Sequence, residues 1–324
     1  MPLVSLVIPI YNEESCIPTL WEQLQKITVG FSGYSVEYIF VDDGSADKSY
    51  SLLERIASET VTAKVLRFSR NFGHQIAITA GLAYASGDAV IVMDADLQDP
   101  PEVLKQMIAK YEAGYDVVYA VRKSRSGETF FKKITAKLFY RFLNAMSSIS
   151  IPLDTGDFRL VSRRVADVLK TLGEQDRFVR GLVSWVGFKQ TPIYFERHAR
   201  LAGETKYPLK KMISFAMNGI LSFSTLPLKW ASWLGFVFAG VSGLYIVVVI
   251  FLRIMGHTFP GYASLMVVML LLGGIQLMTI GILGEYVGRL YMESKKRPLY
   301  IVQDVLNIYP SQNETQLPNS SGHI

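Results

Sequence analysis

The chain of 324 residues contains a single cysteine, Cys16, so no disulfide can form within it. This is typical of a protein from a reducing compartment. We expect Cys16 to be a small core residue. The apolar run VSLVIPI at residues 4–10 has no basic residues before it and is shorter than a secretion signal. We therefore expect this run to form a buried strand.

Charged residues are missing from two long stretches near the C-terminus. Residues 230–252 and 258–284 contain no Asp, Glu, Lys or Arg. Each stretch is longer than the about 20 residues with which a helix crosses a bilayer. We predict two transmembrane helices, over about 230–252 and 262–284. The alternative is a pair of buried core helices.

Basic residues lie mainly on the two outer flanks of this pair of spans. They are Lys210, Lys211, Lys229, Arg289, Lys295, Lys296 and Arg297, whereas the link between the spans holds only Arg253. Because positive charge stays on the cytoplasmic side, we expect both termini to be cytoplasmic. We divide the chain into a cytoplasmic catalytic domain (1–207), a juxtamembrane helix (208–228), a transmembrane hairpin (229–290) and a cytoplasmic tail (291–324).

An apolar stripe with helical spacing runs through residues 208–228 and includes Met212 and Phe215. It predicts an amphipathic helix that lies in the membrane interface. The alternative is a helix packed on the sheet of the first domain. Gly235 and Gly243 in the first span permit close helix packing, so we also expect a homo-oligomer.

Apolar runs alternate with amphipathic stretches in the first part of the chain. We expect strands at residues 4–10, 36–41, 63–68, 89–93 and 116–121, and helices at 14–28, 47–58, 72–85 and 101–113. This order predicts an α/β fold with a mostly parallel sheet covered by helices on both faces. Ligands of such sheets bind beyond the carboxyl ends of the strands.

Two carboxylates, Asp94 and Asp96, directly follow the fourth expected strand. Such neighbours repel each other unless a divalent cation binds between them. Mg²⁺ and Mn²⁺ prefer oxygen ligands and are often held by one or two carboxylates together with substrate phosphates. Glu13, Asp43 and Arg122 follow other strands, so we expect them at the same edge of the sheet.

Several motifs resemble those of glycosyltransferase family 2, whose members have the GT-A fold. They are PIYNE at 9–13, VDDGS at 41–45, NFGHQIAITAGLAYASGD at 71–88 and DADLQDPPE at 94–102. The pattern R-x-x-G-x-T-K-Y at 200–207 resembles the motif of polyprenyl-phosphate glycosyltransferases, with Thr205 where many relatives have serine. Dolichyl-phosphate mannose synthases are similar over about the first 200 residues. The two spans resemble those of bacterial bactoprenol glucosyltransferases of the GtrB type.

The resemblance implies a role for each matching position. The donor-binding positions are Pro9, Tyr11, Glu13, Val41, Asp43, Asp94, Ala95 and Asp96. The metal ligands are Asp94, Asp96 and Gln98, for Mg²⁺ or Mn²⁺. The phosphate-binding residues are Arg122, Arg200 and Lys206. Asp157, in DTGDFRL, occupies the place of the catalytic carboxylate.

The resemblance further implies inverting transfer of a hexose to a polyprenyl phosphate such as undecaprenyl phosphate, at the cytoplasmic face of a bacterial inner or plasma membrane. We expect glucose from UDP-glucose, and the alternatives are GDP-mannose or a modified sugar nucleotide. A lipid phosphate has a second pKa near ~6 and is mostly dianionic at neutral pH. Asp157 is therefore either a base or an orienting group. A transporter or flippase subunit with a nucleotide-binding domain is an alternative of another class.

A basic stretch between residues 122 and 141 includes Arg125, Lys132 and Lys133. We expect these residues, with Phe215, to form the acceptor surface. The alternative is a helix face on anionic lipid without substrate contact. No nucleic-acid-binding motif stands out, so we expect no nucleic-acid partner. We expect His74, which follows Asn71-Phe72-Gly73, to be structural.

Overall fold

The computed structural model describes residues 1–122, 155–196, 224–256 and 261–308. Within these residues the strands form one eight-stranded sheet in the order β7-β5-β6-β4-β1-β2-β3-β8. The strands are β1 (Leu3–Ile10), β2 (Ser35–Asp42), β3 (Ala63–Phe68), β4 (Ala89–Val92), β5 (Val117–Arg122), β6 (Thr155–Ser162), β7 (Gln190–Phe195) and β8 (Val302–Leu306).

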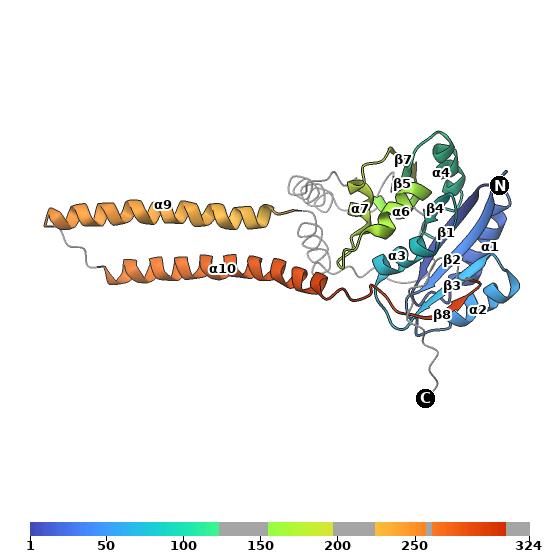
Figure 1. Cartoon of the computed structure of the whole chain (residues 1–324), viewed down its shortest axis with the longest axis horizontal. Coiled ribbons are helices and arrows are strands. Elements are labelled where there is room, and N and C mark those ends of the chain that lie inside the picture. Colours follow the sequence, from blue (N-terminus) through green and yellow to red (C-terminus); the bar gives the residue numbers. More distant parts are fainter. Residues whose placement is uncertain (123–154, 197–223, 257–260, 309–324) are drawn as a thin grey trace, which may run out of the picture.

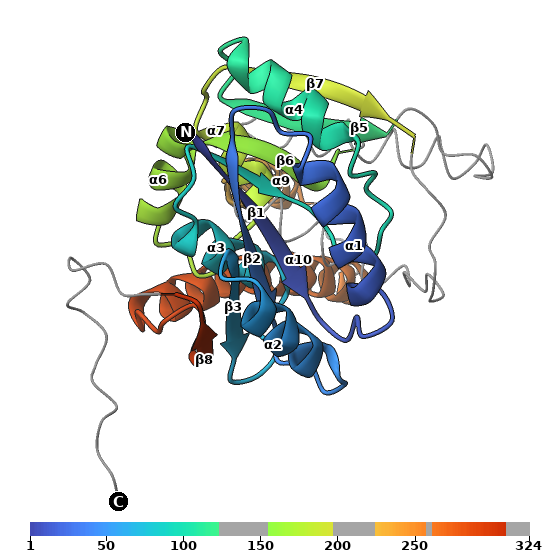
Figure 2. The ribbon, with the colours of Figure 1, turned by 90° about the vertical axis from the view of Figure 1, so that its right-hand side faces the viewer.

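Helices cover both faces of this sheet (Figures 1 and 2). One face packs against α1 (Ile17–Thr28), α2 (Ser49–Glu59) and α4 (Val103–Glu112). The other packs against α3 (His74–Tyr84), α6 (Arg163–Thr171) and α7 (Val179–Trp185). The α/β fold predicted from the sequence is confirmed, and each strand and helix predicted within residues 1–122 has a counterpart within a few residues. The predicted juxtamembrane helix at 208–228 lies almost entirely outside the described residues.

The strand β1 explains why the sheet needs two helical layers. Leu6 and Ile8 belong to the core under α1, whereas Val7 belongs to the core under α3. All three side chains are fully buried. A strand that is buried on both faces reads as a continuous apolar run, which is how VSLVIPI reads in the sequence. Parallel pairing of β1 with β2 and β4 brings the carboxyl ends of these three strands together.

Three strands were not identified from the sequence. β6 lies antiparallel between β4 and β5, and β7 pairs with β5 in parallel. The third, β8, falls in the segment 291–324 that we assigned to a C-terminal tail. It pairs antiparallel with β3 at the edge of the sheet. The side-chain amide of Asn307, just after β8, donates to the carbonyl groups of Ala57 and Ala63 at 2.7 and 2.9 Å. Residues 302–307 thus belong to the sheet domain.

Two long helices, α9 (Leu226–Ile254) and α10 (Tyr262–Ser294), lie side by side and extend away from the sheet (Figure 1). By length and composition, both are apolar enough to cross a membrane. Their apolar side chains are exposed, for example Phe236 at 78% and Leu277 at 73%. The alternative of buried core helices is therefore wrong. Around Gly235 and Gly243 no described atom lies within 4 Å of an added Cβ, so these glycines mediate no close packing in the hairpin as described.

The end of α10 contacts the loop that leads into α7. Arg289 pairs with Asp176 at 3.2 Å, and Glu293 accepts a hydrogen bond from the backbone N–H of Gln175 at 3.0 Å. The side-chain amide of Gln175 donates to the carbonyl of Arg297 at 2.8 Å. The hairpin is thus joined to the sheet domain both by this contact and by β8.

Candidate active site

The turns after β1 and β2 bind each other at the carboxyl edge of the sheet. The backbone N–H of Asn12 donates to Ser45 Oγ at 3.0 Å, and Asn12 Oδ1 accepts from the N–H of Ala46 at 2.9 Å. Gly44 has φ of +69°, and an added Cβ would lie 2.5 Å from the carbonyl carbon of Arg70. Only glycine fits this turn, because a side chain would clash with backbone atoms and would be strained at that φ. The motifs PIYNE and VDDGS therefore lie next to each other at the carboxyl edge of the sheet.

The structure places the predicted donor-binding residues along this edge. Tyr11 is half exposed, whereas Val41 is fully buried. Pro9 and Ala95 are also buried, and Glu13 and Asp96 are half-buried. Arg122 is the last residue of β5. Arg125, Lys132, Lys133, Arg200, Lys206 and Phe215 lie outside the described residues.

Asp43 holds the start of α3 in place. Its carboxylate oxygens accept hydrogen bonds from the backbone N–H groups of Phe72 and Gly73 at 2.6 and 2.9 Å. Asp43 is almost fully buried. This contact positions His74 and Gln75, the first two residues of α3. A donor-binding role for Asp43 remains a prediction.

The DADLQ turn after β4 presents buried oxygen atoms that accept no hydrogen bond from the described residues. Asp94 Oδ1 and Gln98 Oε1 are buried and accept no hydrogen bond from the described part of the chain. Burial and the charges of Asp157 and Asp96 raise the pKa of Asp94, and His74 offsets the shift only in part. Unpaired buried acceptors are costly. A divalent cation prefers oxygen ligands of this kind, so the residues present fit one.

The protein ligands at this turn are few. Across the four described ranges, no group of three or more His, Cys, Asp or Glu side chains is arranged to hold an ion. Asp94, Asp96 and Gln98 remain the predicted ligands for Mg²⁺ or Mn²⁺, and a cation bound there would need further oxygen atoms from a substrate. This matches the way in which Mg²⁺ is commonly held, by one or two carboxylates plus substrate phosphates.

Asp157, near the start of β6, is the centre of a hydrogen-bond network. Arg180 of α7 binds it through Nε at 2.8 Å and through a terminal nitrogen at 2.8 Å, one to each carboxylate oxygen. Gln75 Nε2 donates to the same carboxylate at 3.1 Å, and His74 Nε2 lies 3.2 Å from it. Burial alone would raise the pKa of Asp157, but Arg180, His74 and Arg159 hold it well below the usual value.

His74 links this network to the DADLQ turn. Its Nε2 lies 3.2 Å from Asp157 Oδ2 and 3.4 Å from Asp94 Oδ1. Burial lowers the pKa of His74, but the two carboxylates outweigh burial and raise it. That His74 is structural stays a prediction, but the sequence did not indicate this position between two carboxylates. Gln75 accepts from the N–H of Val179 at 3.0 Å and so also ties α3 to the start of α7.

Arg159 extends the network inward from Asp157, two residues along the same face of β6. Its terminal nitrogen donates to the carbonyl of Gly156 at 2.8 Å and lies 4.0 Å from Asp157 Oδ1. Burial lowers the pKa of Arg159 to about 10, so it is charged at neutral pH. The period-two spacing in DTGDFRL could have indicated this pairing. No sequence signal marked Arg180, which lies in a helix without a recognised motif.

Comparison with known proteins gives the family of the chain. A family model described as "Glycosyl transferase family 2" matches residues 5–169, and a model described as "GtrB C-terminal hairpin" matches residues 226–290. The uncharacterized glycosyltransferase YkcC of Bacillus subtilis (strain 168) is 53% identical over 92% of this chain and 93% of its own length. The bactoprenol glucosyl transferase of Shigella phage SfV is 42% identical over 93% of this chain and 98% of its own length.

Solved structures show a more distant likeness. That of glucosyl-3-phosphoglycerate synthase from Mycobacterium tuberculosis, in complex with Mn²⁺, UDP and phosphoglyceric acid, has a TM-score of 0.47 at 21% identity. It covers 68% of this chain and 76% of that chain. The family model spans half of the chain, and the relatives span nearly all of it. This chain therefore belongs to glycosyltransferase family 2, as its motifs predict, and carries the C-terminal hairpin of the GtrB type.

Proposed function

We propose that this chain transfers glucose from UDP-glucose to a polyprenyl phosphate such as undecaprenyl phosphate, with inversion at the anomeric carbon. The observation that carries the proposal is the combination of two features in one chain. A family 2 domain with an oxygen-rich strand edge is joined to two long helices whose apolar side chains are exposed. The similarity to the relative named bactoprenol glucosyl transferase extends over 93% of this chain and so covers both features.

The sugar nucleotide would bind across the ends of β1, β2 and β4. The positions for it are Pro9, Tyr11, Glu13, Val41, Asp43, Asp94, Ala95 and Asp96. A bound Mg²⁺ or Mn²⁺ would neutralise the charge that develops on the departing nucleotide diphosphate. Arg122, Arg200 and Lys206 would add fixed positive charge for the phosphates. The buried oxygens of Asp94 and Gln98, which accept no hydrogen bond from the described residues, support the position of the cation.

Asp157 acts in this proposal as an orienting group rather than as a general base. Both of its carboxylate oxygens already accept hydrogen bonds, from Arg180, Gln75 and His74. A phosphate acceptor is mostly deprotonated at neutral pH and needs no base. Through these hydrogen bonds Asp157 holds Arg180 and His74 in fixed positions beside the DADLQ turn. Asp157 is therefore a positioning residue in this proposal.

The hairpin would bring this edge to the height of the lipid phosphate. In this proposal α9 and α10 cross the bacterial inner or plasma membrane, with the sheet domain and both termini in the cytoplasm. The return of the chain to the sheet through β8 supports this topology, because it requires both outer ends of the hairpin to lie on the side of the sheet domain. The interfacial helix at 208–228, the acceptor surface and the homo-oligomer remain predictions.

Transfer from a panel of labelled sugar nucleotides tests the proposal. Purified full-length protein in detergent would be mixed with undecaprenyl phosphate, Mg²⁺ or Mn²⁺, and labelled UDP-glucose, GDP-mannose or an amino-sugar nucleotide. We expect labelled lipid from UDP-glucose, its loss with EDTA, and a fall of at least about 100-fold in Asp96→Asn, because donor charge is then poorly neutralised. Labelled lipid only from another nucleotide would overturn the choice of donor. Binding of a sugar nucleotide without transfer of its sugar to the lipid would favour the alternative of a transporter subunit.

A further inference from the structure

The end of α10 holds the segment 172–178 that leads into α7. Gln175, in the middle of this segment, uses two groups for the contact. Its backbone N–H donates to Glu293 Oε2 at 3.0 Å, and its side-chain amide donates to the carbonyl of Arg297 at 2.8 Å. One residue further along, Asp176 pairs with Arg289 at 3.2 Å. Because hydrogen bonds are directional, two of them fix both the place and the orientation of Gln175.

The segment before α7 is also tied to the end of α6. The guanidinium group of Arg177 donates to the carbonyls of Leu169 and Leu172. Three residues separate Gln175 from Val179, the first residue of α7. A displacement of Gln175 would therefore be passed on to the start of α7.

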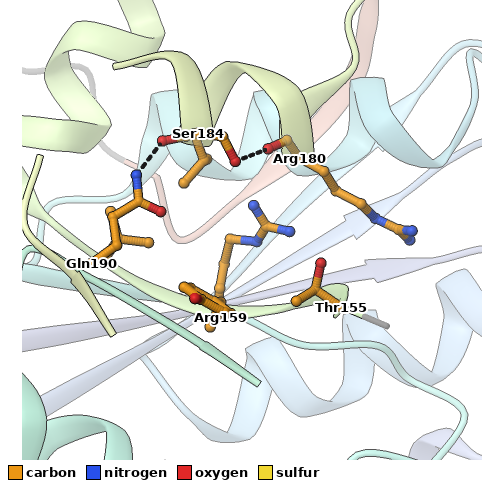
Figure 3. A pocket seen from close by; sticks show the side chains of 8 residues that line it. Thr155, Arg159, Arg180, Ser184 and Gln190 are labelled. Atoms are coloured by element: carbon orange, nitrogen blue, oxygen red, sulfur yellow. Dashed lines mark hydrogen bonds between the residues drawn. The ribbon is translucent and has the colours of Figure 1, made fainter. Parts of the chain in front are cut away.

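The far end of α7 is anchored to β7. The side-chain amide of Gln190 donates to the carbonyl of Val183 at 3.0 Å, and Ser184 Oγ donates to the carbonyl of Arg180 at 3.2 Å within the helix (Figure 3). With seven residues, α7 is too short to be stable without such contacts. The position of its first turn therefore depends on the contacts made at that end.

The first turn of α7 carries two contacts with the candidate active site. The N–H of Val179 donates to Gln75 Oε1 at 3.0 Å, and Arg180 donates to both oxygens of Asp157 at 2.8 Å. Asp157 Oδ2 in turn lies 3.2 Å from His74 Nε2. A small shift of this turn would change the direction of the Arg180 guanidinium group and with it the position of Asp157.

Transfer is more sensitive to such a shift than stability is. A misplacement of about 1 Å that arises far from the reacting atoms can lower a rate by about 100-fold. An exposed hydrogen bond or ion pair, by contrast, contributes little to the free energy of unfolding. Glu293 is exposed. We therefore expect its contact with Gln175 to affect transfer more than folding.

We propose that Gln175 and Glu293 are positioning residues, through which the end of α10 sets the direction of the Arg180 guanidinium group on Asp157. This inference rests on the proposed function, in which Asp157 orients the groups beside the DADLQ turn. The catalytic edge is then complete only when the end of α10 contacts the segment before α7. The hairpin thus takes part in the reaction in addition to holding the sheet domain at the membrane.

Four variants of the full-length chain in detergent test the proposal. Glu293→Ala removes the acceptor of the backbone hydrogen bond, and Gln175→Ala removes the side-chain hydrogen bond. Glu293→Gln keeps an oxygen that can accept from the same N–H. Glu59→Ala is the matched control, because Glu59 is also an exposed glutamate at the end of a helix. For each variant we would measure kcat, the KM for UDP-glucose, Tm, and hydrogen exchange of residues 179–185 by mass spectrometry.

We expect Glu293→Ala and Gln175→Ala to lower kcat by about 5-fold or more and to speed up exchange of the α7 amides by a similar factor. The KM for UDP-glucose should change less than about 2-fold, because the proposed donor positions lie at the ends of β1, β2 and β4. Tm should stay within about 2 °C of that of Glu59→Ala. Glu293→Gln should keep at least about half of the wild-type kcat, because its amide oxygen preserves the hydrogen bond.

Three results would overturn the proposal. One is an equal kcat in Glu293→Ala and Glu59→Ala, and another is faster exchange of α7 without any loss of kcat. The third is an equal loss of kcat in Glu293→Ala and Glu293→Gln, because the proposal depends on the oxygen acceptor. Where Glu293→Ala does not fold, Gln175→Ala decides in its place.

The same measurements separate this inference from the proposed function. If the wild type transfers no sugar from any donor, but exchange of α7 rises in Glu293→Ala and not in Glu59→Ala, the coupling stands and the proposed function fails. Normal transfer by the wild type, with an unchanged kcat in both Glu293→Ala and Gln175→Ala, would leave the function standing and refute the inference.

Discussion

Replacing Asp157 by asparagine should destabilise the protein strongly, although the two side chains have nearly the same shape. Asp157 is 4% exposed and accepts two hydrogen bonds from Arg180, whose side chain is 27% exposed. The variant loses the negative charge that faces two guanidinium groups, those of Arg159 and Arg180. An asparagine amide would also place donors against the donors of Gln75 and His74.

The size of this effect follows from the burial of the pair. Removing one partner of a buried ion pair costs about 3–5 kcal/mol, and the partial exposure of Arg180 favours the lower end, about 3 kcal/mol. For a domain of about 200 residues, each 1 kcal/mol lowers Tm by about 2–4 °C, so we expect a decrease of about 6–12 °C. The assay is thermal unfolding of the full chain in detergent at one fixed scan rate, because unfolding of such a protein is often irreversible.

Asp167→Asn on α6 is the matched control. Asp167 is about half exposed and, among the described residues, forms ion pairs with Arg163 and Lys170 within one turn of its helix. Its loss should therefore change the free energy of unfolding by less than about 0.5 kcal/mol. A decrease in Tm for Asp157→Asn that equals the decrease for Asp167→Asn would refute the reasoning. It would mean that the guanidinium groups do not depend on Asp157 for their charge balance.

Three further predictions concern the fold that supports the site. Gly44→Ala should lower the free energy of unfolding by about 1–3 kcal/mol, because the added Cβ clashes with backbone atoms and the backbone is strained at that φ. The control is Gly173→Ala, where no described atom lies within 4 Å of the added Cβ. Equal Tm values for the two variants would contradict this prediction. Burial alone would raise the pKa of Glu37, but its hydrogen bonds from lysine, serine and backbone groups outweigh burial and lower it from 4.5. The stabilisation contributed by the Glu37 carboxylate is therefore present above pH 4.5 and is lost as the pH falls through the lowered pKa. The Tm difference between wild type and Glu37→Gln should shrink from pH 7 to pH 3.5. A constant difference would disprove this prediction. Breaking the Arg289–Asp176 pair, of which Asp176 is 64% exposed, should cost less than about 1 kcal/mol, and a larger coupling in a double-mutant cycle would show that the hairpin contact matters more than its exposure suggests.

The sequence was sufficient to predict the part of the fold in which apolar strands follow one another closely along the chain. The strands β1, β2 and β4 are apolar runs that end in polar motifs, and their parallel pairing follows from the helices between them. The edge with Asp43, Asp94 and Asp96 could be placed for the same reason. These elements lie close in sequence, so their order restricts their arrangement.

Other parts depend on contacts between distant segments. β8 pairs with β3 across more than 200 residues of chain, and its five residues alternate between half-buried and exposed, which gives a weak sequence signal. Arg180 reaches Asp157 only because α7 packs over β6. The position of His74 could not be predicted because it depends on two carboxylates, Asp94 and Asp157, that come from different segments of the chain.

The most direct test of the account is the anomeric configuration of the lipid product. Full-length protein would be incubated with undecaprenyl phosphate and UDP-glucose labelled with ¹³C at the anomeric carbon, and the extracted lipid would be examined by NMR. UDP-glucose is an α-glycoside, so an inverting transfer predicts a β-linked glucosyl phosphate on the lipid. An α-linked product, or label found in free glucose formed by transfer to water rather than in the lipid, would contradict the account.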